Sequence, residues 1–467
     1  AQAAAPRSPP HSRRPCPSPR PSALARAGAV GGRLPRSSNS IIVWAMWRAL
    51  SRRGVCGSAV ASRGRQRLSS TASFAGLQED VEFTRDSDFE RCKGPIKVLR
   101  LVGEDGRLVG GAELPFSFEE AVGMYRTMVR ISVVDQILNS LQRQGRVSFY
   151  MTGTGEEAAQ VGTIAALDAG DVVWPQYREL GAFMHRGFSI QQVVDQCMSR
   201  AAEAGKGRQM PVHYCAAEFN MQAVTSPLAT QIPQAVGAGY AFRMGEEPRC
   251  GVAYFGDGAA SEGDFAVALN FAATLRAQTL FLCRNNGWAI STPAKEQYAG
   301  DGIAVRGIAY GMPAIRVDGN DLAAVFLATR RARELCLQGE PVVVELMTYR
   351  RGHHSTSDDA TRYRGGTEVK SMARAGLEPL SRARLLLEAE GRWGEPQEEE
   401  LREKTREEVM SALKLAEAKR FAPVADMFSD VWAKETPQLR RQREELFQHI
   451  ERHPEEYRER LKQFEGH

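Results

Sequence analysis

Between residues 250 and 293 the order of apolar and polar positions predicts a strand, a helix and a second strand. The run from Cys250 to Phe255 is apolar, short and stopped by a glycine, which is typical of a strand buried on both faces of a parallel sheet. Ser261 can cap a helix, and the apolar residues behind it recur at three- and four-residue spacing: Phe265, Leu269 and Ala272. A second apolar run extends from Thr279 to Cys283. The pattern indicates one βαβ unit.

A long helix is predicted ahead of this unit. Ser117 and Glu120 form a capping box, and Gly145 ends the pattern. The apolar residues of this helix recur at helical spacing: Met124, Met128, Ile131, Val134, Leu138 and Leu141. Packing is the usual role of such a stripe, so we interpret it as core or subunit contact rather than as a cofactor site.

Strands and helices alternate along the remainder of the chain. Strands are predicted over 171–174, from Ile315 and over 341–346, with a helix over 321–338. We therefore predict an α/β fold with a mostly parallel sheet and helices on both faces. From about Pro379 the sequence is charged and helical in pattern. There we expect a C-terminal helical extension that packs on a partner, with tryptophan anchors: Trp393 and Trp432.

The net charge is unevenly distributed. The 467 residues carry +5, but residues 1–78 contain thirteen Arg and no Lys, Asp or Glu, which leaves −8 for the remainder. An Arg-, Ser- and Ala-rich segment without acids is typical of an organellar transit peptide, here a mitochondrial presequence. We expect it to start at Met46, the first methionine, and residues 1–45 to be untranslated or mispredicted sequence. A nucleic-acid-binding arm is the alternative, disfavoured because the segment lacks lysine and interleaved aromatic residues.

These patterns divide the chain into four parts. We expect a leader over 1–78, an N-terminal arm over 79–116, a cofactor-binding domain over 117–380 and the helical extension over 381–467. The sequence has no run of 18 apolar residues, so no membrane insertion is expected. Six cysteines lie beyond the leader without CxxC pairing or metal-ligand spacing, which fits a reducing matrix.

Two polar turns follow the two strands of the βαβ unit, GDG at 256–258 and NNG at 285–287. Ligands of open α/β sheets bind beyond the carboxyl ends of the strands, so we expect Asp257 and Asn286 to converge there. Carboxylate and amide oxygens suit Mg²⁺, which takes its other ligands from water and phosphates. Either turn alone is common. Together, with 26 residues between GDG and NN, they resemble the thiamine diphosphate motif.

Longer segments carry a more specific resemblance. QYRE at 176–179, GKGRQMPVHY at 205–214, SPLATQIPQAVGAGYA at 226–241 and GHHSTSDD at 352–359 resemble the α subunits of mitochondrial branched-chain 2-oxo acid dehydrogenases, in their decarboxylase component. The resemblance is dense over residues 115–380 and loose beyond them. It implies the thiamine diphosphate-binding fold.

The same resemblance implies ligand sets. The residues that would contact thiamine diphosphate are Gln176, Tyr177, Arg178, Ser226, Leu228, Gly256, Gly258, Ala259, Arg284 and His354. Those that would hold Mg²⁺ are Asp257, Asn286 and, through its backbone carbonyl, Trp288. Those that would hold a structural K⁺ are Thr225, Pro227, Thr230 and Gln231.

The segment 347–364 contains the adjacent histidines 353 and 354 between hydroxyl and acidic residues. Such a pair can transfer protons near neutral pH, although an arbitrary pair is more often part of a polar surface loop. The resemblance implies that His354 acts at the active site and that Ser355 is the target of a dedicated kinase and phosphatase. A phosphate beside His354 would add about two negative charges and block or disorder the site.

The activity implied is thiamine diphosphate-dependent oxidative decarboxylation of the branched-chain 2-oxo acids from Val, Leu and Ile, with reductive acylation of the lipoyl group of a transacylase core. Thiamine enzymes use a glutamate on a second, related domain to activate the cofactor, and the chain is long enough for only one such domain. We therefore expect the activating glutamate to come from a β subunit in an α₂β₂ heterotetramer of the mitochondrial matrix. Three alternatives remain: a pyruvate-type α subunit, which typically reads GHSMSDP in the regulated loop; a cofactor-holding subunit without turnover alone; and the basic-armed nucleic-acid-binding protein.

Overall fold

The computed structural model of the chain describes residues 71–72, 81–82, 95–373 and 377–466. The predicted leader therefore lies outside the described residues, apart from the two-residue strand β1 (Thr71–Ala72), which pairs antiparallel with β2 (Val81–Glu82). These two strands belong to a unit that ends at Glu90, and the fold described below lies within the unit Arg91–His467.

A six-stranded sheet forms the centre of this second unit, and every neighbouring pair in it is parallel. Its strand order is β3-β9-β10-β6-β5-β4. In chain order the strands are β3 (Val98–Leu99), β4 (Val172–Trp174), β5 (Gly251–Gly256), β6 (Thr279–Asn285), β9 (Ala314–Asp318) and β10 (Val342–Met347). The sheet confirms the predicted α/β fold class.

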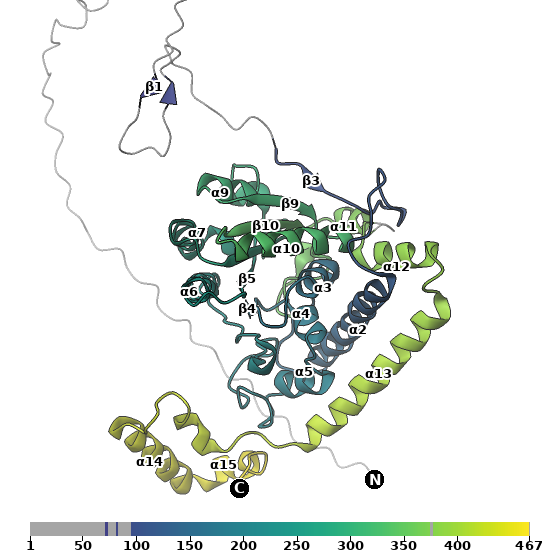
Figure 1. Ribbon diagram of the computed structural model, residues 1–467. Helices are drawn as coiled ribbons and strands as arrows, with labels where there is room; N and C mark the ends of the chain where they lie inside the picture. The colour runs from purple at the N-terminus through teal and green to yellow at the C-terminus, as the bar shows by residue number, and fades with distance from the viewer. Residues whose placement is uncertain (1–70, 73–80, 83–94, 374–376, 467) are drawn as a thin grey trace, which may run out of the picture. The chain divides into compact units, whose positions relative to one another are not determined.

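Alternate residues of the central strands pack on opposite faces of the sheet. Val252 and Tyr254 join one hydrophobic core, and Ala253 and Phe255 join the other. The helices that supply the first core are α2 (Phe118–Arg143), α3 (Glu157–Ala165), α4 (Leu180–His185), α5 (Ile190–Cys197), α10 (Leu322–Leu337), α12 (Pro379–Ala389) and α13 (Glu395–Ala418). Those that supply the second are α6 (Gln231–Met244) and α7 (Gly263–Leu275), together with Ile303 and Met312 on either side of α9 (Ala304–Ala309) (Figure 1). The predicted helices on both faces are thus confirmed.

The ends of two helices test the capping predictions. The predicted capping box of Ser117 and Glu120 is present at the start of α2. The predicted cap of Ser261 is wrong, because residues 259–261 form a 3₁₀ turn and α7 begins at Gly263. The Ser261 N–H donates to the Gly258 carbonyl in that turn, so the chain is already coiled before the α-helix starts.

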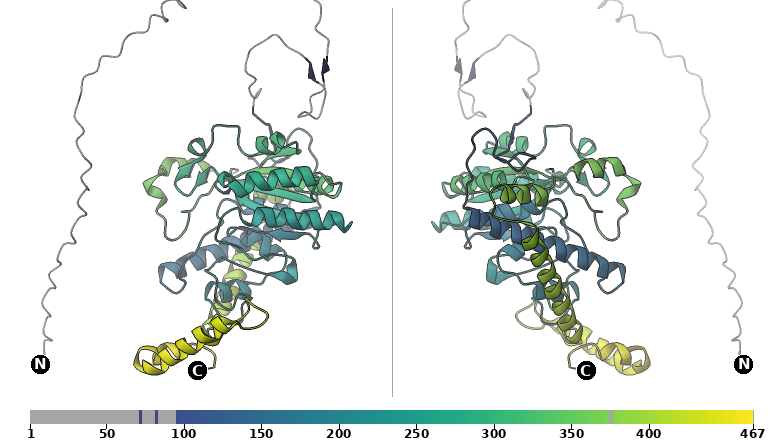
Figure 2. Two further views of the ribbon diagram at one scale, coloured as in Figure 1. Left: turned by 90° about the vertical axis from the view of Figure 1, so that its left-hand side faces the viewer. Right: turned by 90° about the vertical axis from the view of Figure 1, so that its right-hand side faces the viewer.

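The chain ends in the helices α11 (Gly366–Met372), α12 (Pro379–Ala389), α13 (Glu395–Ala418), α14 (Pro437–Arg452) and α15 (Pro454–Leu461). α13 packs along α2 and α5, and Figure 2 shows it leading to α14 and α15, drawn in yellow. Trp393 is buried and its indole N–H donates to Glu398 at 3.0 Å, as expected of an anchor, whereas Trp432 is 63% exposed. The extension is helical as predicted, and its boundaries and partner stay predictions. Among the described residues, no helix is long and apolar enough to cross a membrane.

Candidate active site

A cavity of about 500 Å³ opens at the carboxyl ends of β4, β5 and β6. Every residue predicted to contact the cofactor or Mg²⁺ lines it. These residues come from five separate segments: Gln176, Tyr177 and Arg178; Ser226 and Leu228; Gly256, Asp257, Gly258 and Ala259; Arg284, Asn286 and Trp288; and His354. Their convergence follows from the parallel sheet, in which neighbouring strands deliver the following turns to one edge. Their individual roles stay predictions.

Asp257 lies directly beyond β5 and is almost fully buried. Its carboxylate accepts a hydrogen bond from Gln297 Nε2 at 2.9 Å, and burial raises the pKa of the carboxyl group above its usual value. The next residue must be small, because a Cβ on Gly258 would lie 2.7 Å from the Cβ of Ala289. The GDG turn therefore brings one carboxylate to the cavity and allows a second backbone segment to approach it closely.

Asn286 follows β6, and its side-chain amide is held at both ends. Nδ2 donates to Glu156 Oε1 at 2.9 Å, and Oδ1 accepts from the Trp288 backbone N–H at 3.2 Å. Trp288 begins β7 (Trp288–Ala289), which pairs antiparallel with β8 (Thr292–Pro293). Among the described residues there is no cluster of three or more His, Cys, Asp or Glu that could hold a metal. One carboxylate, one amide oxygen and one backbone carbonyl still form an all-oxygen set, which suits Mg²⁺ together with phosphate oxygens.

Arg284 is fully enclosed between two carboxylates that the sequence analysis did not single out. Its Nη1 pairs with Glu156 and its Nε with Glu179, and all three side chains are buried. The two carboxylates raise the pKa of the guanidinium despite its burial, so Arg284 remains charged. Because the two pairs use Nε and Nη1, Nη2 is the nitrogen left to face a phosphate oxygen.

His354 lies between two arginines. Arg178 Nη2 is 3.2 Å and Arg350 Nη1 3.3 Å from His354 Nδ1, and Arg178 Nη2 also donates to the His354 carbonyl at 2.7 Å. Burial and these two cations lower the pKa of His354 to about 3. Its imidazole is therefore neutral at physiological pH. Since both arginines donate toward Nδ1, the network assigns the ring proton to Nε2.

The loop that carries His354 is held mainly by side chains. Arg364 donates to the carbonyls of Arg350 and Gly352, and Asp358 accepts from the His354 N–H at 2.8 Å. Ser355 is 8% exposed, and its hydroxyl accepts from the Ser357 N–H at 3.2 Å. Ser355 also lines a further cavity of about 210 Å³, together with Asp135, Tyr150 and His353.

The residues predicted to bind K⁺ form a tight group at the start of α6. The Thr230 hydroxyl donates to the Pro227 carbonyl at 2.9 Å and lies 3.3 Å from the Thr225 hydroxyl. Gln231 Nε2 donates to the Tyr254 carbonyl, while its Oε1 is buried without a hydrogen-bond partner among the described residues. Ala229 has a φ of 66°, a left-handed conformation that costs a non-glycine residue about 1–2 kcal/mol. These neutral oxygens fit a monovalent cation.

Comparison with known proteins identifies the family. A family model described as "Dehydrogenase E1 component" matches residues 125–425, more than half of the chain. The chain belongs to the dehydrogenase E1 component family. The match spans every segment that lines the cavity and all of helix α13.

Several curated E1 components are similar over most of their length. The mitochondrial 2-oxoisovalerate dehydrogenase subunit alpha of Dictyostelium discoideum is 47% identical over 384 residues, which cover 82% of this chain and 87% of that protein. The protein of the same name from Mus musculus is 47% identical, covering 78% and 82%. Subunit alpha 2 from Arabidopsis thaliana is 44% identical, covering 81% and 79%. The resemblance to α subunits of mitochondrial branched-chain 2-oxo acid dehydrogenases is thus confirmed.

Several further residues contact the predicted site residues of this E1 component and were not predicted as site residues from the sequence. They are Glu156, Glu179, His213, Gln297 and Arg350. His213 Nε2 lies 2.7 Å from the Ser226 hydroxyl, and its Nδ1 lies 3.1 Å from the Pro211 carbonyl. Glu179 and His213 do stand within the segments that carried the resemblance, QYRE and GKGRQMPVHY, which was the available signal.

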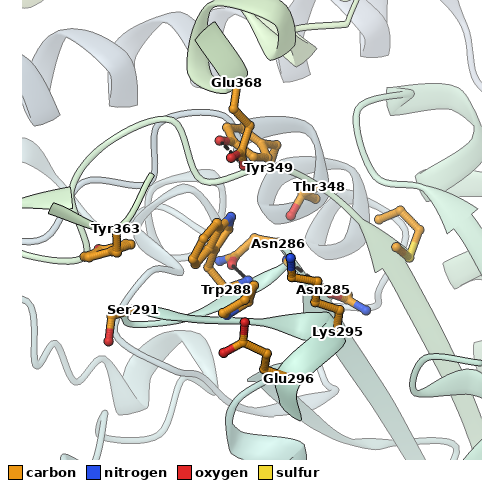
Figure 3. Close-up of a pocket in the computed structure, with 13 residues that line it drawn as sticks. Asn285, Asn286, Trp288, Ser291, Lys295, Glu296, Thr348, Tyr349, Tyr363 and Glu368 are labelled. Atoms are coloured by element: carbon orange, nitrogen blue, oxygen red, sulfur yellow. Dashed lines mark hydrogen bonds between the residues drawn. The ribbon is translucent and has the colours of Figure 1, made fainter. Parts of the chain in front are cut away.

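A second cavity, of about 700 Å³, is also lined by the turn 285–288 (Figure 3). Asn286 and Trp288 line both cavities. Tyr349 closes part of this second cavity and its hydroxyl donates to Glu368 at 2.9 Å. The turn that carries Asn286 is therefore a thin wall between two cavities, so its side-chain contacts matter for its position.

Proposed function

We propose that this E1 component is the α subunit of a mitochondrial enzyme that oxidatively decarboxylates the branched-chain 2-oxo acids derived from Val, Leu and Ile. The acyl group then passes to the lipoyl group of a transacylase core. The observation that carries this proposal is the convergence of five separate segments on one cavity at the ends of the parallel strands. The similarity to relatives named 2-oxoisovalerate dehydrogenase subunit alpha, mitochondrial, supports the choice of substrate class and compartment.

The donor set of the cavity fits thiamine diphosphate with Mg²⁺. Asp257, Asn286 and the Trp288 carbonyl would hold the metal, and Arg178 and Arg284 supply positive charge for the diphosphate. Gln176 Oε1 is buried without a partner among the described residues, so it is an acceptor that a ligand can satisfy. When bound, thiamine diphosphate supplies a nucleophilic carbon and an electron sink for decarboxylation. A structural K⁺ would be held by the oxygens of Thr225, Pro227, Thr230 and Gln231.

His354 is the proposed catalytic proton-transfer residue. Arg178 and Arg350 keep its imidazole neutral and leave Nε2–H as the proton donor. The neutral ring presents Nε2–H, which can donate a hydrogen bond to a developing oxyanion. Arg178 also fixes the ring position, since it binds both Nδ1 and the backbone carbonyl of His354.

A β subunit would complete the site in an α₂β₂ heterotetramer. Ser226 and Leu228 line the cavity and are exposed in the single chain, Leu228 by 36%, which is the arrangement expected where a second chain covers the cofactor. The β subunit would supply the activating glutamate. The lipoyl domain of the transacylase core would approach the same cavity. Ser355 would be the regulatory phosphorylation site for a kinase and a phosphatase, and it lines a cavity beside His353.

The test is CO₂ release from 3-methyl-2-oxobutanoate and from pyruvate. The chain from residue 79 is assayed with and without a matching β subunit, in the presence of thiamine diphosphate, Mg²⁺ and an artificial electron acceptor. We expect turnover of the branched acid only with β, and its loss in Asp257→Ala. A strong preference for pyruvate would contradict the substrate class in favour of a pyruvate-type α subunit. No turnover of either acid with β bound would contradict the proposed activity.

A further inference from the structure

Glu156 is a fully buried carboxylate at the start of α3, and its two oxygens serve different partners. Oε1 accepts from Asn286 Nδ2 at 2.9 Å, and Oε2 pairs with Arg284 Nη1. The preceding residue fixes the backbone there: Gly155 has a φ of 92°, and a Cβ on it would collide with the Tyr349 carbonyl. Glu156 therefore sits on a rigid turn and links two residues at the carboxyl end of a different element, β6: Arg284 within the strand and Asn286 directly after it.

The contact with Glu156 decides which way the Asn286 amide faces. In the observed orientation, Nδ2 donates to a carboxylate and Oδ1 accepts from the Trp288 N–H at 3.2 Å. Figure 3 shows Asn286 beside Trp288 at the wall of the second cavity. A flipped amide would place Oδ1 against the negative Glu156 and Nδ2 against the Trp288 N–H, so both contacts would become repulsive. With Oδ1 kept away from Glu156, its second lone pair is available to a cation.

The same carboxylate restrains Arg284. Glu156 and Glu179 occupy Nη1 and Nε, so the guanidinium plane is fixed along two of its edges. The group of Glu156, Glu179 and Arg284 carries a net charge of −1, and Asp257 adds a further carboxylate on the cavity wall. Arg178 and Arg350 also line the cavity, so the carboxylates favour a cation there while the arginines supply positive charge for a diphosphate.

We propose that Glu156 is a positioning residue that orients the amide of Asn286 toward the metal and the guanidinium of Arg284 toward the diphosphate. This inference rests on the proposed function. Groups that orient metal ligands in this way typically contribute 10- to 100-fold to metal affinity. Glu156 itself would not touch the metal, since both of its oxygens are occupied by the two groups that it positions.

The test measures binding rather than turnover. Mn²⁺ binding to the assembled α₂β₂ enzyme is followed by electron paramagnetic resonance at fixed thiamine diphosphate, for the wild type and for Glu156→Gln. The neutral glutamine can present an amide N–H to Asn286 and so permits the flipped orientation. We expect Mn²⁺ to bind about 10- to 100-fold more weakly. The matched control is Glu296→Gln, which removes an exposed carboxylate at the second cavity without touching Asn286 and should leave Mn²⁺ affinity unchanged.

Testing Glu156→Gln in the Asn286→Asp variant as well as in the wild type separates the effect of the Asn286 amide orientation from the effect of the Glu156 charge. In Asn286→Asp both ends of the side chain are oxygens, so no orientation is left to select. We expect Glu156→Gln to weaken Mn²⁺ binding in the wild-type background but not in the Asn286→Asp background. Equal weakening in both backgrounds, or none in the wild type, would overturn the proposal.

Failure of the variant to assemble and failure of the proposed function are distinguished by separate controls. If Glu156→Gln does not assemble, Glu156→Asp takes its place. Aspartate keeps the charge but is one methylene too short to reach both partners, so Mn²⁺ binding should weaken several-fold. Wild-type Mn²⁺ affinity in that variant would overturn the proposal. A wild-type enzyme that binds Mn²⁺ and thiamine diphosphate but releases no CO₂ would contradict the proposed function, while the binding comparison would still decide the role of Glu156.

Discussion

Two regions that meet at the cavity are held in place by different means. Asp257 and Asn286 directly follow β5 and β6, whose parallel pairing continues to Gly256 opposite Arg284. His354, in contrast, lies in a segment, residues 348–359, that contains no helix or strand. There the backbone is held by arginine side chains that bind carbonyl oxygens. The strand-end region is therefore coupled to the folding of the sheet, whereas the His354 loop depends on individual hydrogen bonds that can be lost without unfolding the core.

The largest effect is expected where the strand-end region holds buried charge. The substitution Arg284→Leu leaves Glu156 and Glu179 buried without their cation, which typically lowers the free energy of unfolding by about 3–5 kcal/mol. We expect a clear fall in the midpoint of thermal unfolding of the assembled enzyme and the loss of thiamine diphosphate binding. Arg243→Leu, at an exposed helix position, is the matched control and should unfold like the wild type. An unchanged midpoint for Arg284→Leu would refute the coupling between this site and folding.

A smaller effect on stability and a clear effect on turnover are expected in the His354 loop. Arg350 donates to the Ile290 carbonyl at 2.7 Å and to the Tyr363 hydroxyl at 3.1 Å, and it approaches His354 Nδ1. These partners are neutral, so Arg350→Leu strands no carboxylate. The displaced imidazole should lower kcat about 10²-fold, since misplacement of a catalytic group by 1 Å can cost that much.

Steady-state kinetics of the assembled enzyme, with thermal unfolding in parallel, separate the two regions. An equal fall of the unfolding midpoint in Arg350→Leu and Arg284→Leu, or an unchanged kcat in Arg350→Leu, would contradict the proposed difference between the two regions.

The same difference explains what the sequence could predict. Apolar runs of fixed period located β5, α7 and β6, and the turns after the strands placed Asp257 and Asn286 at one edge. Local patterns carry no information on partners far apart in the chain. Glu156 is 128 residues from Arg284, and Arg178 is 176 residues from His354. The depressed pKa of His354 was likewise unpredictable, because it results from burial and from two arginines that only the fold brings together.

The neutral state of His354 predicts how stability depends on pH. The pKa of the imidazole is about 3 in the folded protein and about 6.5 in an unfolded chain. Between these values the unfolded state binds a proton that the folded state does not, so the free energy of unfolding falls as the pH falls below about 6.5. One such group contributes at most about 1.4 kcal/mol per pH unit.

Thermal unfolding at pH 7.5 and pH 5.5 tests this effect. We expect His354→Asn to lose less stability than the wild type between the two conditions. His353→Asn, at the exposed neighbouring position, is the control and should keep the wild-type dependence. If His354→Asn and the wild type show the same pH dependence, the imidazole is not held neutral by its surroundings.

The smallest effect is expected at the proposed K⁺ site, where a bound cation, rather than strand pairing or arginine side chains, would hold the loop. Residues 225–231 have neither a strand ladder nor an arginine across their carbonyls, and Ala229 adopts a left-handed conformation there. The Thr230 hydroxyl donates to the Pro227 carbonyl, and Gln231 Oε1 has no partner among the described residues, so a cation can bind between these oxygens. Binding to the folded state stabilises it by RT ln(1 + [K⁺]/Kd), about 0.4 kcal/mol at a concentration equal to Kd.

Potassium should therefore raise the unfolding midpoint of the wild-type enzyme slightly, at constant ionic strength set with a large organic cation. In Thr230→Val, which keeps the shape of the side chain but removes the oxygen, the rise should be reduced or lost. Thr274→Val, at an exposed position of α7, should respond like the wild type. An equal response to K⁺ in Thr230→Val would show that the loop is held by its own hydrogen bonds, as the His354 loop is, and not by a cation.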